Sequence, residues 1–235
     1  MKKNVKISDN TIRRLPKYLR KLSDLQSDGV QRISSFELGN SLGNTPSQIR
    51  QDFSHFGNFG QQGYGYHVEN LQESIREILG LDQQMSAILL GVGNIGQALM
   101  KNFDFTLCGV QLQAAFDIDP GKIGNTVNGL VVRDQAELAA YLKNAKPDLA
   151  ILCVPSDVAV ELAGKLIALG IEAIWNFTNT EITAGDSEVL VENLHFTDSL
   201  LTLRYYIAKR NEDRVKKEEK YLRTTGSRPK RPQLF

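Results

Sequence analysis

Residues 89–100 read LLGVGNIGQALM, and this stretch decides the fold of the larger part of the chain. An apolar, strand-like run over residues 85–90 leads directly into the pattern G-x-G-x-x-G, and helix-like residues follow. Glycines there let the backbone approach a pyrophosphate, and the start of a helix presents unpaired amides to its negative charge. Because the pattern follows a strand and opens a helix, it predicts a dinucleotide-binding loop. The expected contacts are Gly91, Val92, Gly93, Asn94, Ile95 and Gly96.

A second strand, residues 112–116, ends at Asp117, 21 residues after Gly96. A carboxylate in that position accepts hydrogen bonds from the ribose hydroxyls of adenosine and repels a 2′-phosphate, which favours NAD(H) over NADP(H). A cap on the end of the strand is the alternative role for Asp117.

Strand and helix patterns continue to alternate downstream. Residues 149–155 and 171–177 are strand-like, and a helical stretch over 158–169 ends at Gly170 between them. This alternation predicts a doubly wound parallel sheet with its ligand at the carboxyl ends of the strands. The ends concerned are Val154-Pro155 and Asn176-Phe177.

The N-terminal third has a different pattern. Residues 12–25 form a basic amphipathic helix, with Pro16 expected near its first turn. Residues 34–37 (SSFE) offer a capping box, and residues 45–48 (TPSQ) repeat the device after a Gly43-Asn44 turn. Helix, short turn, helix is the helix-turn-helix arrangement, whose second helix lies in the major groove of DNA.

The second of these helices has two kinds of face. Ile49, Phe53 and Phe56 are spaced to point into a core. Arg reads guanine and Gln reads adenine through paired hydrogen bonds, so the other face suits base contact. An ordinary exposed helix carries similar residues, so this pattern alone leaves both interpretations open. The outward set is Ser47, Gln48, Arg50, Gln51 and His55.

The stretch FGNFGQQGYGY, residues 56–66, follows directly. Its glycines allow a tight hairpin, and Phe59, Tyr64 and Tyr66 are expected to pin the base of that hairpin. A hairpin after a recognition helix is the wing of a winged helix, and a plain connecting hairpin is the alternative.

The charge distribution is compatible with a nucleic-acid-binding terminus joined to a domain that binds another ligand, and equally with ordinary solvated faces. Residues 85–197 carry 6 Lys/Arg against 13 Asp/Glu, whereas residues 198–235 carry 11 against 5. No apolar run is long enough to cross a bilayer and no secretion signal opens the chain, so we expect a cytoplasmic protein without a membrane partner. Cys108 and Cys153 are expected to be small buried core residues, and no metal site is indicated.

Together these motifs resemble the Rex family of redox-sensing transcriptional repressors, over nearly the full chain to about residue 210. The matching stretches are RLPxYLR at 14–20, SSxEL at 34–38, IRxDFSxFG at 49–57, GxGY at 63–66, GVGNIG at 91–96, AFD at 115–117, NF at 176–177 and VEN at 191–193.

The resemblance implies an α/β chain with an N-terminal winged helix-turn-helix and a Rossmann-type doubly wound parallel sheet. It also implies a homodimer with a domain-swapped C-terminal helix, in which Phe196 approaches the partner's nicotinamide. NADH would release the dimer from palindromic double-stranded operator DNA, whereas NAD+ would permit binding. The expected divisions are 1–80 for DNA binding, 85–197 for NAD(H), 198–210 for the exchanged helix and 211–235 for a flexible charged tail, which is either solvated or a supplementary phosphate contact.

The complete set of expected DNA contacts is Arg14, Ser47, Gln48, Arg50, Gln51, Ser54, His55, Gln61, Gln62 and Tyr64. Several positions depart from the family pattern. The wing tip has Gln61-Gln62 in place of two basic residues, and the recognition segment opens with Arg50-Gln51 in place of a basic pair. A polar switch network in the family corresponds here to Arg20, Asn102 and His195, of which the last two differ. The segment after Asn176-Phe177 continues as Thr178-Asn179.

Two alternatives therefore remain beside a redox-sensing repressor. One is a paralogue that binds DNA but has weakened or lost its response to NADH. The other is an NAD-dependent oxidoreductase with an N-terminal interaction module. Since two of the three histidines lie in the N-terminal third, the Rossmann half lacks an evident acid or base for hydride chemistry, and we expect no enzyme.

Overall fold

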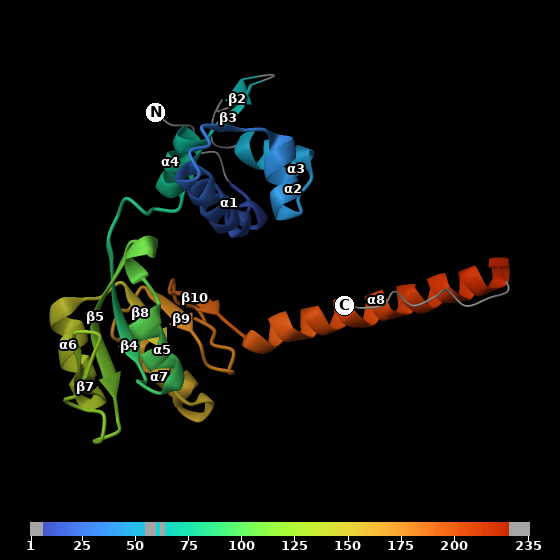
Figure 1. Cartoon of the computed structure of the whole chain (residues 1–235). Coiled ribbons are helices and arrows are strands. Elements are labelled where there is room, and N and C mark those ends of the chain that lie inside the picture. The colour runs from blue at the N-terminus through green and yellow to red at the C-terminus, as the bar shows by residue number, and fades with distance from the viewer. Residues whose placement is uncertain (1–6, 55–59, 62–63, 226–235) are drawn as a thin grey trace. The chain divides into compact units, whose positions relative to one another are not determined.

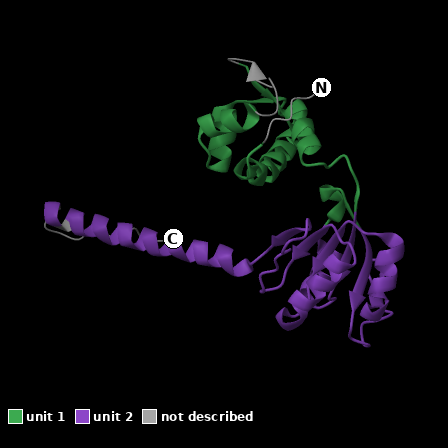
Figure 2. Cartoon of the chain, turned by 180° about the vertical axis from the view of Figure 1, so that it is seen from behind, with its two compact units in different colours: residues 1–85, 104–111 green, residues 86–103, 112–235 purple. Residues whose placement is uncertain are grey.

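The computed structural model describes residues 7–54, 60–61 and 64–225 of the chain (Figure 1). The chain folds as two compact units, coloured separately in Figure 2. We call residues 1–85 with 104–111 the head, and residues 86–103 with 112–235 the body. Each unit has a hydrophobic core built from its own residues.

The described residues of the head form four α-helices and a small antiparallel sheet. The helices are α1 (Asp9–Ser27), α2 (Ser35–Leu42), α3 (Pro46–Ser54) and α4 (Val68–Ile78). The strands are β1 (Arg32–Ile33), β2 (Gly60–Gln61) and β3 (Gly65–His67), in the order β1-β3-β2. The helix-turn-helix of α2 and α3 followed by a hairpin is the predicted winged-helix arrangement, to which the structure adds β1.

Local signals explain where these helices begin and end. The capping box of α2 is complete, because Ser34 accepts from the Glu37 amide and Glu37 accepts from the Ser34 amide. Gly43, at φ 69°, ends α2 in the left-handed conformation. The start of α1 differs from the prediction, since Ser8 caps a helix that begins at Asp9 and Pro16 lies inside it.

The core of the head joins α1, α3 and the wing strands through aromatic rings. Phe53 is in edge contact with Tyr18 (centroids 5.2 Å apart) and with Tyr66 (5.0 Å). Gly65 in β3 has φ +73°, and a β-carbon there would lie 2.6 Å from the Ile33 carbonyl oxygen, so the hairpin requires a glycine. Tyr66 pins the hairpin as expected, but Tyr64 is 70% exposed and does not.

The body is a seven-stranded sheet in the order β10-β9-β8-β4-β5-β7-β6. The pairs β10/β9, β9/β8, β8/β4 and β5/β7 are parallel, and β6 is antiparallel to β7. The strands are β4 (Met85–Leu90), β5 (Val110–Asp117), β6 (Thr126–Val127), β7 (Leu130–Asp134), β8 (Leu149–Leu152), β9 (Ala173–Asn176) and β10 (Leu190–Asn193). The predicted Rossmann-type sheet is confirmed, and the sequence patterns did not identify β6, β7 and β10.

Helices cover both faces of this sheet. α6 (Leu138–Ala145) and α7 (Ser156–Ala168) pack on Ile88 and Leu90, whereas α5 (Asn94–Asn102) approaches the alternate residue Leu89. Two 3₁₀ turns, η1 (Phe105–Cys108) and η2 (Gln135–Glu137), complete the connections. The chain leaves β4 for β5 on one side and returns to β8 on the other. This reversal places the expected ligand crevice at the carboxyl ends of β4 and β8.

Two sequence-based expectations outside the site are wrong. Cys108 is exposed, because η1 lies at a turn before Gly109, whereas Cys153 is partly buried and its burial raises the pKa of its thiol to about 12. The last helix, α8 (Phe196–Thr225), continues well beyond residue 210, so residues 211–225 are helical and not a flexible tail. Lys, Arg and Glu, which dominate this extension, are good helix formers.

Candidate functional site

The fingerprint loop, which joins β4 to α5, lies close to the neighbouring backbone. Gly91 has φ +91°, and a β-carbon on it would lie 2.6 Å from the Cys153 carbonyl oxygen of the neighbouring strand end. A β-carbon on Gly96 would overlap the carbonyl oxygen of Gly91. Gly93, in contrast, faces open space and caps α5 with no side-chain hydrogen bond. The first turn of α5 therefore presents amides suited to a phosphate.

Asp117, at the end of β5, is only 6% exposed and holds this loop in place. Its carboxylate accepts from the Val92 amide (2.7 Å) and from the Asp119 amide (2.9 Å). Burial opposes the charged form, but these two amides and Lys122 outweigh it and keep the pKa of Asp117 below its ordinary value. Asp117 is therefore charged at neutral pH, as a ribose acceptor must be, while it also braces the loop.

Lys122 is a neighbour of Asp117 that sequence reasoning missed. Its ammonium lies 3.2 Å from the Asp117 carboxylate and 3.7 Å from that of Asp119. The loop after β5 turns back at Gly121, whose amide donates to Asp119, and this turn brings the lysine to the strand end. An aspartate-rich turn, Asp117 to Gly121, was the available signal.

At the carboxyl ends of β8 and β9, some of the predicted cofactor contacts interact with other residues of the chain. Asn176 is fully buried, and its side-chain amide donates to Asn193 (2.7 Å) and to the Thr180 carbonyl (2.8 Å). Its oxygen accepts from the Thr178 amide, so the chain itself occupies this predicted cofactor contact. Val154 and Pro155 lie at the end of β8, where a Val154 methyl would be 3.0 Å from a β-carbon on Gly91.

Aromatic rings line the β9 side of this edge. Phe177 is buried in edge contact with Trp175, with centroids 4.5 Å apart. Phe196, at the start of α8, lies 6.3 Å from Phe177 and is more than half exposed. The ring contacts continue away from this edge to Phe103 at the far end of α5, 5.7 Å from Trp175. These rings make the β9 end of the edge apolar, in contrast to the charged end at Asp117.

In the head, a buried carboxylate joins the recognition helix α3 to α1. Asp52, only 1% exposed, accepts from both Nε and Nη2 of Arg14 at 2.7 and 2.6 Å. Tyr18 and Gln48 donate to it at 2.6 and 2.9 Å. Burial opposes its charge, but these donors keep the pKa of Asp52 low, and burial together with Asp52 raises the pKa of Tyr18. Arg14 and Gln48, predicted to contact DNA, are thus engaged within the head.

The remaining predicted DNA contacts have different surroundings. Ser47, Arg50, Gln51 and Ser54 lie on the exposed side of α3, as predicted, and Arg50 donates to the Ser35 hydroxyl at 3.0 Å. Gln61 lies in β2, and Tyr64, the residue before β3, is exposed. His55 and Gln62 lie outside the described residues.

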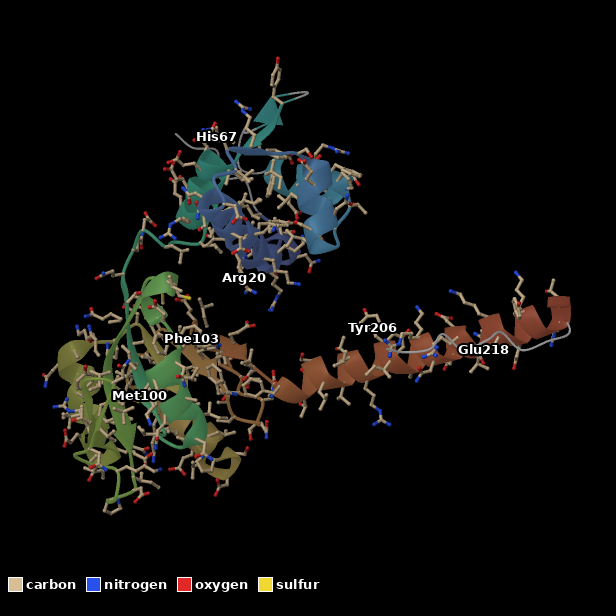
Figure 3. The ribbon with its side chains drawn as sticks, viewed as in Figure 1. Arg20, His67, Met100, Phe103, Tyr206 and Glu218 are labelled. Carbon is tan, nitrogen blue, oxygen red and sulfur yellow. The ribbon has the colours of Figure 1, made fainter. Side chains whose placement is uncertain are left out.

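The three positions of the expected switch network belong to different units. Arg20 is exposed on α1 of the head (Figure 3). In the body, Asn102 is exposed at the end of α5, and the His195 ring nitrogen Nε2 lies 2.8 Å from the Glu181 carboxylate. Glu181 also accepts from Asn193 at 3.0 Å, which ties His195 to the Asn176 network through one carboxylate.

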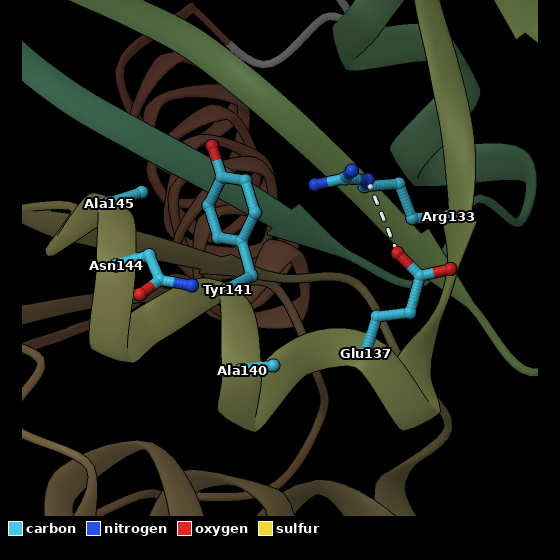
Figure 4. Close-up of a pocket in the computed structure, with 6 residues that line it drawn as sticks. All are labelled: Arg133, Glu137, Ala140, Tyr141, Asn144 and Ala145. Atoms are coloured by element: carbon cyan, nitrogen blue, oxygen red, sulfur yellow. Dashed lines mark ion pairs between the residues drawn. The ribbon is translucent and has the colours of Figure 1, made fainter.

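A surface hollow of the body lies apart from these residues. Figure 4 shows Arg133 over the Tyr141 ring, 5.2 Å from its centroid, and paired with Glu137 at 3.5 Å. None of its lining residues belongs to the fingerprint or to the strand ends described above. Within residues 7–54, 60–61 and 64–225, no group of His, Cys, Asp and Glu could hold a metal ion. No described helix has the length and apolarity to span a membrane.

Two family models match the chain. The model described as "Putative DNA-binding protein N-terminus" matches residues 6–54, and the model described as "CoA binding domain" matches residues 82–180. The redox-sensing transcriptional repressor Rex of Caldicellulosiruptor saccharolyticus is 46% identical over 218 residues, covering 93% of this chain and 97% of the relative. The protein of the same name from Thermoanaerobacter pseudethanolicus is 43% identical, covering 94% and 96%.

Solved structures agree with these sequence matches. The crystal structure of RSP, a repressor of the same family, in complex with β-NAD+ and operator DNA has a TM-score of 0.81 and 42% identity, covering 92% of this chain and 97% of that one. The complex of RSP with β-NADH has a TM-score of 0.80 and 39% identity, covering 88% and 97%.

Proposed function

The chain belongs to the Rex family of redox-sensing transcriptional repressors, and on that premise we propose that it represses transcription by binding operator DNA and leaves the operator when NADH binds. One observation carries the proposal: a helix-turn-helix with an exposed polar recognition face and a dinucleotide loop braced by Asp117 occur in one chain. The solved complexes of RSP with NAD+ and operator DNA, and with NADH, support the same two ligands.

The proposed roles of the site residues follow from the geometry. The loop at Gly91–Gly96 and the start of α5 would hold the pyrophosphate, Asp117 the adenosine ribose, and the apolar β9 end the nicotinamide. On DNA, Arg50 and Gln51 would read bases, and Ser47 and Ser54 would contact the backbone. We assign Arg14, Gln48 and Asn176 to support of these groups, because their polar atoms are engaged internally.

A homodimer completes the proposal. Exposed apolar side chains follow α8: Leu200, Leu201, Leu203, Tyr205, Tyr206, Ile207 and Val215. So much exposed apolar surface on one helix indicates a protein interface. A second copy that exchanges this helix would bury it, and a two-fold symmetric dimer fits a palindromic operator.

We propose that the protein is a regulator and not an enzyme. Its relatives are named as repressors, and the cofactor in such a protein acts as a signal. Because its target is chromosomal DNA, we place it in the cytoplasm. The proposed divisions remain residues 1–80 for DNA, 85–197 for the dinucleotide and the helix from 198 for dimerisation.

The test is a titration of operator binding. Fluorescence anisotropy with a labelled palindromic operator should show tight binding without NADH and weaker binding as NADH is added, with a coupling of about 1–3 kcal/mol. NAD+ added in place of NADH should leave binding intact. Calorimetry with each nucleotide is run in parallel. No binding to DNA, or no binding of NADH, would contradict the proposal.

A second candidate is a repressor that binds NADH but whose affinity for the operator does not change when NADH binds. The observation in its favour is that His195 pairs with Glu181 of its own unit, at a position where the family pattern has an aspartate. Under this candidate, calorimetry detects NADH binding while operator affinity stays constant. The same titration therefore separates the two functions.

A further inference from the structure

One exposed aromatic residue of the head has no role in the function proposed above. Phe36, in the first turn of α2, is 62% exposed. Its neighbours in the sequence already have hydrogen-bond partners. Ser34 and Glu37 form the capping box, and Ser35 accepts from Arg50. Single exposed apolar side chains are common on protein surfaces, so the location of this ring beside the recognition helix decides what it can contact.

Phe36 lies beside the recognition helix. Gly39 packs against the segment that leads into α3, because a β-carbon on it would lie 2.6 Å from the Asn44 carbonyl oxygen. Phe36 precedes Gly39 by three residues and therefore shares its side of α2. The hydrogen bond from Arg50 to Ser35, at 3.0 Å, fixes the middle of α3 at the same turn of α2. The ring thus flanks the side of α3 that carries Arg50.

The charge at this helix start disfavours a phosphate partner. The first turn of a helix normally attracts anions, but the Glu37 carboxylate already occupies it, accepting from the Ser34 amide (2.9 Å) and hydroxyl (2.8 Å). These two donors lower the pKa of Glu37, so it is charged at neutral pH. A phosphate would be repelled there, whereas an apolar group would be accepted.

We propose that Phe36 contacts the 5-methyl group of a thymine at the edge of the major groove and so selects a T·A pair next to the bases read from α3. This inference rests on the proposed operator binding. The thymine methyl is the apolar group that the major groove presents, and Phe is among the side chains that contact it. Phe36 would in this way distinguish a T·A pair from other base pairs without forming a hydrogen bond.

The experiment uses the full-length protein and uracil in place of thymine. A preferred operator is first selected from random DNA with the wild-type chain, and each symmetry-related pair of thymines is then replaced by uracil, which removes only the methyl group. For the wild type, one such replacement should weaken binding by about fourfold per methyl, the value of one buried methyl-sized group. With Phe36→Ala, that replacement should have no effect, and Phe36→Leu should restore part of it.

Leu107→Ala is the matched control, because it removes another exposed apolar side chain, 72% exposed, from a turn outside α2 and α3. It should keep the full sensitivity to uracil, and thermal unfolding should show that the Phe36 variants fold as the wild type does. If uracil weakens operator binding at no position, or weakens it equally for the wild type and Phe36→Ala, Phe36 does not contact a thymine methyl. Failure to select any DNA would instead overturn the proposed function, and this inference with it.

Discussion

Asp52 in the head and Asp117 in the body are two buried carboxylates with different partners. Side chains from α1 and α3 surround Asp52, whereas backbone amides of Val92 and Asp119, with one partly exposed lysine, hold Asp117. A carboxylate has about four lone-pair positions, so Asp52 has none to spare. Asp117 accepts three donors and retains capacity for a ribose hydroxyl. The type of partner, and not the degree of burial, distinguishes a structural carboxylate from one that is poised for a ligand.

The largest effect should come from removing the structural carboxylate. Asp52→Ala leaves the Arg14 guanidinium and the Tyr18 hydroxyl without their acceptor, so we expect the head to lose about 3 kcal/mol or more of unfolding free energy. Operator binding should be lost with it. The chain's one tryptophan, Trp175, lies in the body, so urea unfolding followed by tryptophan fluorescence and by circular dichroism separates the two units. Unchanged head stability would refute the structural role.

Removing the other carboxylate should affect binding more than folding. Asp117→Ala deletes the ribose acceptor, and we expect NADH to bind about 10- to 100-fold more weakly in calorimetry, since hydrogen bonds to charged groups contribute about 1.5–3 kcal/mol. Operator binding in the absence of NADH should persist. An unchanged dissociation constant would mean that Asp117 serves only to brace Val92.

Acid should weaken the head by the same route as Asp52→Ala, but less. Because the folded-state pKa of Asp52 is depressed, its stabilising contribution is complete above the unfolded value of about 3.9 and is lost as pH falls through the folded value. The urea midpoint of the head should therefore be retained from pH 7 to about pH 5 and should fall as the pH is lowered from 4 to 3. In Asp52→Ala this carboxyl is absent, so the fall should be shallower, and an identical fall would assign the acid sensitivity elsewhere.

A smaller effect should follow from opening the α2 cap. Ser34→Ala removes one acceptor for the Glu37 amide, and we expect a loss of about 1 kcal/mol in head stability. Ser74→Ala is the control, because its hydroxyl donates only to the Asn70 carbonyl within α4. Equal losses in both variants would show that the cap is not the cause.

The smallest effect on affinity concerns the wing. Gln61→Lys combined with Gln62→Arg adds two positive charges where family members carry them. If both charges neutralise phosphates, the slope of log affinity against log salt steepens by up to about 1.8 per wing. Operator binding measured at several salt concentrations tests this. A slope equal to that of the wild type would mean that the wing tip does not meet DNA.

Local patterns predicted most of the fold, because helix caps and glycine turns are encoded within a few residues of where they act. The capping box at Ser34, the strand 85–90 and the fingerprint helix are examples. The partners of Asp52 could not be predicted in this way, since Arg14 and Tyr18 lie 38 and 34 residues away in the chain. Arg14 therefore read as a DNA contact.

Other misses have similar causes. β10 reads LVEN and pairs only with β9, so it lacks the continuous apolar run that marked β8, which is equally short and reads LAIL. The extension of α8 is rich in charged residues, and composition alone does not separate a solvated helix from a solvated tail. The partner of Asn176 was missed too, because Asn193 lies 17 residues away on another strand, whereas the contact of Asn176 with the cofactor stays a prediction.

The separate cores of head and body have a consequence in genetics. A missense change in the core of the head leaves the core of the body intact, because no residue is shared between the two hydrophobic clusters. Such a polypeptide should still pair through α8 with a normal copy and produce mixed dimers with one sound head. Since a palindrome demands two heads, alleles of this kind should be dominant over the wild type, whereas alleles that destroy the body should be recessive.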